Sequence, residues 1–126
     1  PLMDARRNQV YTGIYRFAAV GSEWQMEAVK EQCAVAIEEI VAAINEQGRS
    51  VVFLGDGVPV FSSYISEHCK VPYIFAPAHM NKQNAAAVAA LGIRYMKEGR
   101  METAAEHKPE YLRLSQAERE RMEAGK

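Results

Sequence analysis

Val51-Val52-Phe53-Leu54-Gly55-Asp56-Gly57 is a short apolar run, rich in β-branched and aromatic residues, that ends abruptly in a glycine turn. Such a run closed by a turn signal predicts a buried strand. Helical patterns lie on both sides of it, so we expect a central strand in a sheet covered by helices. Gly55 and Gly57 would let a ligand approach the backbone at the end of this strand. A tight strand-to-helix turn explains the same two glycines, because a short glycine motif has low specificity.

The composition predicts a single globular domain rather than a disordered or membrane-spanning chain. The sequence has 126 residues, 48% of them hydrophobic, and a net charge of −1. Mixed charges of nearly equal number argue against a strongly basic nucleic-acid surface. No apolar run reaches the roughly 18 residues of a membrane span. Cys33 and Cys69 lie in apolar contexts, which favours two buried thiols in a reducing compartment and a cytoplasmic location, although the sequence leaves a disulfide open.

The chain begins at Pro1, inside a predicted strand, so we expect a piece of a longer protein. Residues 1–110 read as one α/β domain, and residues 111–126 as a C-terminal extension. Ser115 and Glu118 have capping-box spacing for a short charged helix over 116–123.

Three strands are predicted before the first helix. Residues 2–5 form a short strand, and 9–17 alternate with Val10, Thr12 and Ile14 on one face and Tyr11, Tyr15 and Phe17 on the other. A third strand covers 24–33, with Trp24, Met26 and Ala28 on one face. Arg6-Arg7-Asn8 and Val20-Gly21-Ser22 supply the turns. Short links between successive strands predict an antiparallel meander.

The second half of the domain alternates helices and strands. Apolar residues at Ile37, Ile40, Val41 and Ile44 have helical spacing, and Gly48 ends that helix. A second helix follows the glycine turn, with Pro59 in its first turn and Phe61, Ile65 and Cys69 on its inner face. Tyr73-Ile74-Phe75 is a further strand, and a third helix covers about 83–98.

The predicted order is βββαβαβα with a C-terminal helical tail. Two crossover units after a meander predict an α/β fold with a five-stranded mixed sheet. This order resembles the ribonuclease-H-like unit that the actin-like ATPase superfamily uses in duplicate, so the chain corresponds to half of such a protein. Fold alone does not define function.

Few residues have the spacing of a catalytic or metal site. His68, His79 and His107 are scattered and are expected on the surface, and neither cysteine has an activating cation. Asp4 lies on the first predicted strand and Asp56 at the end of the fourth, but two carboxylates are too few for a two-metal nuclease. We therefore expect Asp4 to fix the following turn. The aromatic residues of the meander would serve core packing or subunit contact, and base stacking is the alternative.

Four motifs together resemble the C-terminal half of TsaB-family proteins, also called YeaZ, which are inactive relatives of the glycoprotease-like TsaD proteins. The motifs are Met3 to Tyr11, Phe53 to Gly57, Ala85 to Gly92, and Tyr111-Leu112-Arg113. Their order covers nearly the whole chain.

The resemblance implies a non-catalytic role in forming threonylcarbamoyladenosine in tRNA. The implied partners are a TsaD-like catalytic subunit and a TsaE-like ATPase, and tRNA is contacted indirectly. ATP and metal would then belong to the partner subunits, so no cofactor is expected on this chain. TsaD-like enzymes begin one helix with Asp-Asn-Ala-Ala, whose aspartate helps to bind metal. The matching residues are Gln83 to Ala86, and an amide is a poorer metal ligand than a carboxylate.

No catalytic or metal-binding residue is therefore predicted. Gly55, Asp56 and Gly57 are a possible nucleotide turn or a structural motif, and the candidate interaction residues are Asp4, Arg6, Arg7, Tyr111 and Arg113. Half of an ATP-dependent kinase or hydrolase is the alternative, resting on the glycine turn. A glycoprotease-type metallopeptidase is a third hypothesis. Half of a two-lobed protein would expose apolar surface, which predicts a homo-oligomer.

Overall fold

The computed structural model describes residues 1–113 and Arg121, and of Glu23 only the backbone. The chain divides into two compact units, residues 1–82 and 83–126. The division predicted at residue 110 stays a prediction, and the predicted helix over 116–123 lies outside the described residues apart from Arg121.

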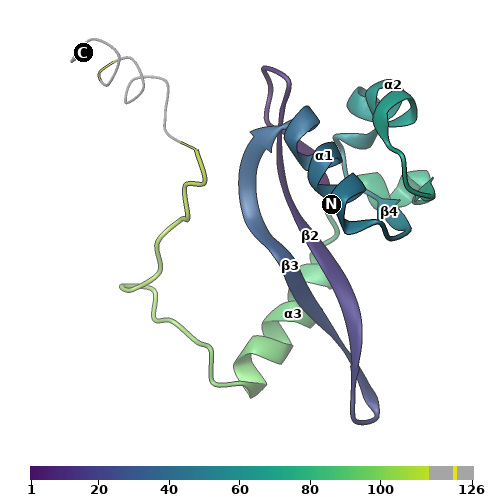
Figure 1. Cartoon of the computed structure of the whole chain (residues 1–126). Coiled ribbons are helices and arrows are strands. Elements are labelled where there is room, and N and C mark those ends of the chain that lie inside the picture. Colours follow the sequence, from purple (N-terminus) through teal and green to yellow (C-terminus); the bar gives the residue numbers. More distant parts are fainter. Residues whose placement is uncertain (114–120, 122–126) are drawn as a thin grey trace. The chain divides into compact units, whose positions relative to one another are not determined.

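The first unit has the predicted order of strands and helices (Figure 1). Its elements are β1 (Leu2–Asp4), β2 (Gln9–Val20), β3 (Glu23–Ala36), α1 (Ile37–Gln47), β4 (Val51–Phe53), α2 (Val58–His68), β5 (Tyr73–Phe75) and the 3₁₀ helix η1 (Ala78–Asn81). An antiparallel sheet has the order β1-β2-β3, and β4 pairs with β5 in parallel. The predicted α/β class is confirmed.

Strands β2 and β3 form a hairpin that is longer than predicted. Their distal halves extend beyond α1 and α2 as a two-stranded arm (Figure 1). Phe17 pairs with Met26 and Ala19 pairs with Trp24. The predicted faces are correct, because directly paired residues of an antiparallel ladder lie on the same face. Gly21 turns the chain at a φ of 61°.

The two sheets are joined at Leu2. Its amide donates to the carbonyl of Leu54 at 2.7 Å, and its carbonyl accepts from the amide of Gly57 at 3.0 Å. These two bonds place β1 beside the end of β4. The arrangement is compatible with a ribonuclease-H-like fold, while a single five-stranded sheet stays a prediction.

The core lies between the sheets and the two helices. The predicted stripe of α1 is buried, together with Phe61 and Ile65 of α2. The ring of Phe53 contacts the rings of Tyr73 and Phe75, with centroids 6.0 and 6.1 Å apart. Cys69 lies just after α2, half-buried against this core. Gly48 ends α1 in the left-handed conformation, as predicted.

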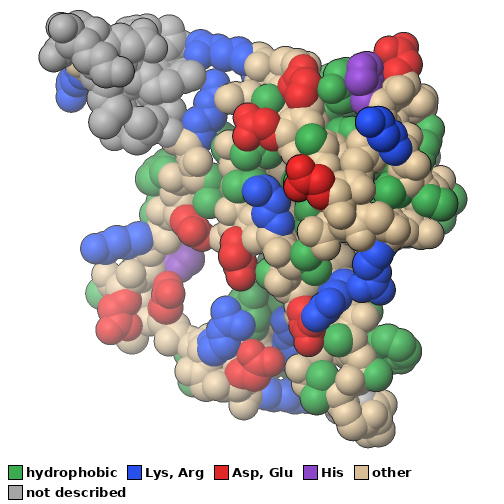
Figure 2. Space-filling model, in the orientation of Figure 1, with side chains coloured by type: hydrophobic (Ala, Val, Ile, Leu, Met, Phe, Trp, Pro, Cys, Tyr) green, Lys and Arg blue, Asp and Glu red, His purple; other side chains and the backbone are tan. Residues whose placement is uncertain are grey.

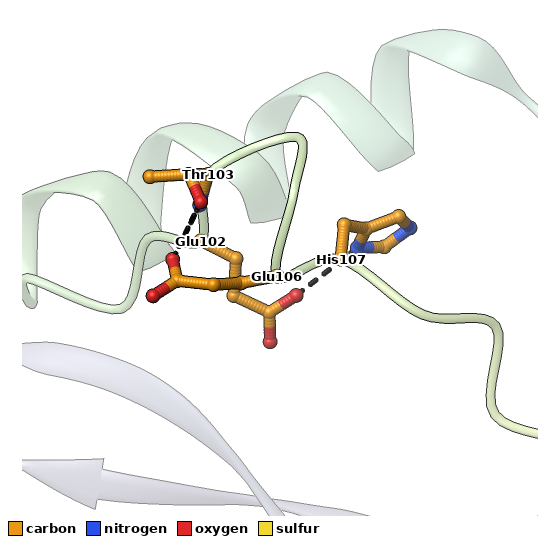
Figure 3. A network of polar contacts seen from close by, with 4 residues as sticks. All are labelled: Glu102, Thr103, Glu106 and His107. Atoms are coloured by element: carbon orange, nitrogen blue, oxygen red, sulfur yellow. Dashed lines mark hydrogen bonds and ion pairs between the residues drawn. The ribbon is translucent and has the colours of Figure 1, made fainter.

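The second unit contains α3 (Ala85–Lys97), which starts two residues later than predicted and ends one earlier. The Asn84 side chain caps the helix by accepting the amide of Ala86 at 2.9 Å. A separate turn follows at Glu102–His107 (Figure 3). There Glu106 accepts from the amide and hydroxyl of Thr103, at 3.0 and 2.7 Å, and His107 pairs with Glu102 at 3.1 Å.

This turn is expected to open in acid. The hydroxyl and amide of Thr103 hold the pKa of the Glu106 carboxyl below its ordinary value. Because the pKa of the Glu106 carboxyl is lower in the folded turn than in the unfolded chain, ionised Glu106 stabilises the turn at pH values above the unfolded-state pKa. This stabilisation is lost as the pH falls through the folded-state pKa. An NMR titration of the Glu106 carboxyl carbon checks this. Thr103→Ala should return that pKa toward its ordinary value, and an unchanged pKa in the variant would contradict the assignment.

Candidate functional site

The glycine turn after β4 is filled by the chain's own first strand. Gly55 has a φ of 109°, and a Cβ atom there would lie 2.2 Å from the carbonyl oxygen of Leu2. A Cβ atom at Gly57 would lie 3.1 Å from the Cβ of Leu2. The absence of a side chain at both glycines therefore permits the close approach of β1, so a bound ligand is not needed to explain them. The interpretation as a tight strand-to-helix turn accounts for both residues.

Asp56 connects this turn with the end of β1. Its Oδ1 atom accepts the amide of Asp4 at 3.2 Å. The Asp4 carboxylate in turn accepts the amide of Arg6 at 2.8 Å and pairs with the Arg6 guanidinium at 3.3 Å. The predicted role of Asp4, fixing the next turn, is confirmed. The structure thus brings Asp4, Arg6 and the Gly55–Gly57 turn together at one end of the first unit.

The turn from Arg6 to Asn8 is strained. All three residues have positive φ values, 62°, 55° and 59°. For a residue such as arginine, this conformation costs roughly 1–2 kcal/mol. Backbone bonds from Ala5 to Gln9 and from Gln9 to Arg6 close the turn. Asn8 anchors it to α1 through its carbonyl, which accepts the amide of Ile37, and through its side-chain amide, which donates to Glu38.

Sequence reasoning predicted this turn but not its left-handed backbone. Asparagine adopts positive φ more readily than most residues, so Asn8 is the one local signal for it. Two successive arginines give no such signal. Strained segments that the surrounding bonds hold in place occur frequently at functional sites. The turn therefore stands out as an exposed cationic feature on a rigid support.

Replacing Arg7 with glycine is expected to stabilise the fold by about 1 kcal/mol, because glycine adopts positive φ without a Cβ penalty. Urea denaturation measures the change. Arg49→Gly is the matched control. Arg49 is also exposed and lacks a positive φ, so its replacement should lower stability by a few tenths of a kcal/mol. Equal effects of the two variants would show that the turn is not strained.

Tyr111 and Arg113, the other two candidate interaction residues, lie in the second unit. Tyr111 is exposed and Arg113 is half-buried. No described strand or helix contains them. Their proposed role in interaction stays a prediction.

The histidines and cysteines are placed much as expected. His68 stacks on Tyr64 with ring centroids 4.0 Å apart, and all three histidines are exposed. Cys33 and Cys69 are free thiols, half-buried rather than buried. Cys69 packs against the margin of the core. Among the described residues, no three His, Cys, Asp or Glu side chains are grouped to hold a metal ion.

An open groove of about 740 Å³ runs beside β2 and β4. Its lining is mainly apolar and includes Ile14, Phe17, Met26 and Val52. Arg16 and Arg49 are the charged side chains among the described residues that line it, and those residues include no carboxylate, histidine or thiol for acid–base or nucleophilic chemistry. The groove suits contact with an apolar segment.

Charged side chains do not gather into one basic area on the face that Figure 2 shows, where described Lys and Arg residues alternate with Asp and Glu. Within the described part of the chain, no helix has the length and apolar character needed to cross a membrane.

The order of elements and the joined sheets define an α/β protein compatible with the ribonuclease-H-like fold. Over its full 126 residues, the chain is 29% identical to the tRNA threonylcarbamoyladenosine biosynthesis protein TsaB of Bacillus subtilis (strain 168). The chain spans 52% of that protein, about half its length. The predicted resemblance to TsaB is confirmed, and the match is consistent with a TsaB-like C-terminal domain. No family model matches the chain.

Proposed function

We propose that this chain is the C-terminal lobe of a TsaB-like scaffold that supports the formation of threonylcarbamoyladenosine in tRNA. Its partners are a TsaD-like catalytic subunit and a TsaE-like ATPase, and it contributes no catalytic residue. The similarity to TsaB along the whole chain carries this proposal. A protein that acts on tRNA through such partners would work in the cytoplasm.

Two structural features support the non-catalytic part of the proposal. Leu2 of the chain itself occupies the space beside Gly55 and Gly57, so their small size needs no nucleotide to explain it. At the start of α3, the Asn84 side chain is engaged in capping the helix. The neighbouring Gln83 offers a neutral amide, which is a weak ligand for a hard cation.

The partner contact is proposed at the Arg6–Asn8 turn. This turn presents the exposed Arg6 side chain next to Asp4 and is held rigidly by α1. A rigid, charged turn is suited to an orienting contact, because charge complementarity sets register and association rate more than affinity. The expected counterpart is an acidic surface of the catalytic subunit.

A reconstituted modification assay tests the proposed role. It contains a TsaD-like subunit, a TsaE-like ATPase, the threonylcarbamoyl donor system and tRNA, with intact Bacillus subtilis TsaB as positive control. The test protein is a chimera in which residues 1–126 replace the matching segment of that TsaB. We expect the chimera to support modification. Residues 1–126 alone should not, because they span half of the relative.

The outcome is decisive when the chimera folds. A chimera with the circular dichroism spectrum and melting behaviour of TsaB, but with no activity, would contradict the proposed role. Activity of residues 1–126 alone would show that the other half is dispensable and would overturn the two-lobe interpretation.

The rival hypothesis, half of an ATP-dependent kinase or hydrolase, predicts nucleotide binding at Gly55–Gly57. Titration calorimetry of ATP with magnesium into the chimera separates the two. We expect no heat of binding, because β1 fills the glycine turn. Saturable heat that Asp56→Ala removes would favour the rival. The metallopeptidase hypothesis is tested by incubating the chimera with zinc and an unfolded protein substrate, where cleavage would support it.

A further inference from the structure

The distal arm of the β2–β3 hairpin has one apolar face. The residues that share this face are paired across the ladder as Tyr15 with Ala28, Phe17 with Met26, and Ala19 with Trp24. Phe17 is 70% exposed and Trp24 72% exposed, so neither belongs to the core. Core packing, one of the roles predicted for the aromatic residues of the meander, is therefore wrong for Phe17 and Trp24.

The other face of the arm carries charged and polar side chains. Arg16 pairs there with Glu27, with a nitrogen–oxygen distance of 2.9 Å, and Ala18 lies opposite Gln25. Val20, near the tip, is a large apolar residue on this side and is 47% exposed. A ribbon with one charged face and one aromatic face favours burial of the aromatic face alone.

We propose that the apolar face of this arm packs against the same face of a second copy of the chain. The three pairs alternate in size around the middle pair of Phe17 and Met26. A two-fold axis across that middle pair sets each Trp24 against Ala28 of the other copy, and each Ala19 against Tyr15. Every large side chain then meets a small one or its own symmetry mate, which is the self-complementarity that an isologous interface requires.

The area available predicts a reversible dimer. An aromatic side chain has roughly 150–250 Å² of surface. With their exposed fractions, Phe17 and Trp24 together offer about 250 Å², and the whole face about 400 Å² per copy. Two copies would bury about 800 Å², below the range of permanent interfaces.

The open edge of β3 is a less suitable contact. This strand lies at the end of the described sheet order, so its edge could in principle pair with another strand. The register shifts near Val29, and Lys30 and Glu31 follow at once. A bulge and adjacent charges are the features that protect edges from pairing.

The sole tryptophan of the chain reports on the contact directly, because Trp24 packs against Ala28 of the other copy in the proposed interface. The chain is followed from roughly 1 µM to 1 mM by sedimentation velocity and by tryptophan fluorescence with acrylamide quenching. We expect a concentration-dependent dimer. The Trp24 emission should shift to the blue, and its quenching should fall, with the same midpoint as the change in mass.

Two variants of equal charge test the face. Ala28→Glu places a carboxylate opposite Trp24 of the second copy and should abolish dimerisation, since an unpaired charge would be buried. Gln25→Glu adds the same charge to the opposite face and should leave the dimer unchanged. Both positions are exposed in the single chain, and circular dichroism verifies that both variants fold.

Three results would overturn the proposal. The first is a monomeric mass at every concentration. The second is an oligomer in which Trp24 emission stays unchanged, as edge pairing through β3 would give. The third is an equal effect of Ala28→Glu and Gln25→Glu.

Discussion

Replacing Gly55 with alanine is expected to destabilise the fold by about 3–5 kcal/mol, near the upper end of single-residue effects. Two costs combine at this position. The backbone φ of 109° lies outside the region that alanine adopts readily. The added methyl group would also lie 2.2 Å from the carbonyl oxygen of Leu2, which is backbone and cannot rotate away. β1 would have to move, and its bonds to Leu54 and Gly57 would be lost.

Gly48→Ala separates these two costs. Gly48 also has a positive φ, 63°, but a Cβ atom there meets nothing within 4 Å. This variant should lose about 1–2 kcal/mol, the cost of the left-handed backbone alone. Urea denaturation of both variants, followed by circular dichroism, measures the difference. Equal losses would show that Leu2 does not approach the turn as closely as described, and would reopen it to a ligand.

Ile65→Ala should destabilise the chain by about 3 kcal/mol. Ile65 is 0% exposed and lies on the inner face of α2, within the cluster formed with α1. Removing a buried isoleucine costs the transfer free energy of the lost carbons and that of the cavity left behind, typically 2–5 kcal/mol in total. The loss is measured as a lowered urea midpoint with an unchanged slope.

Ile74→Ala is the matched control, because it makes the same chemical change on β5 where the side chain is 63% exposed. It should cost less than 1 kcal/mol. A large effect at Ile74 would show that another surface covers β5 in solution. A small effect at Ile65 would show that α2 is not packed as described.

Much of the architecture was predictable because it depends on short-range pattern. Alternation assigned Phe17 to one face of the second strand and Trp24 to one face of the third, and helical spacing placed Ile40 and Ile44 on the buried side of α1. The role of Asp4 in fixing the following turn also comes from a local rule, since aspartate commonly accepts the amide two residues ahead. Each of these features involves residues that are close in sequence or that repeat with a fixed period.

The site was less predictable because its parts come from distant segments. Asp4 and Asp56 are 52 residues apart, and nothing local to either indicates their contact. The left-handed backbone of Arg6 and Arg7 is likewise imposed from outside, by the anchoring of Asn8 to α1. Residue types that rarely adopt this conformation offer no signal for it.

The order of the strands and helices, the faces within each element and the resemblance to TsaB can all be read from the amino-acid sequence. Periodicity and turn chemistry act over a few residues, so they can be read without coordinates. The role of the glycines after β4, in contrast, becomes visible only in the folded chain. A missing side chain shows that something lies close by, but the identity of that neighbour, here the backbone of Leu2, depends on how β1 and β4 meet in space. Likewise, periodicity shows that Trp24 lies on an apolar face of its strand. That face is exposed because the arm extends beyond the helices (Figure 1).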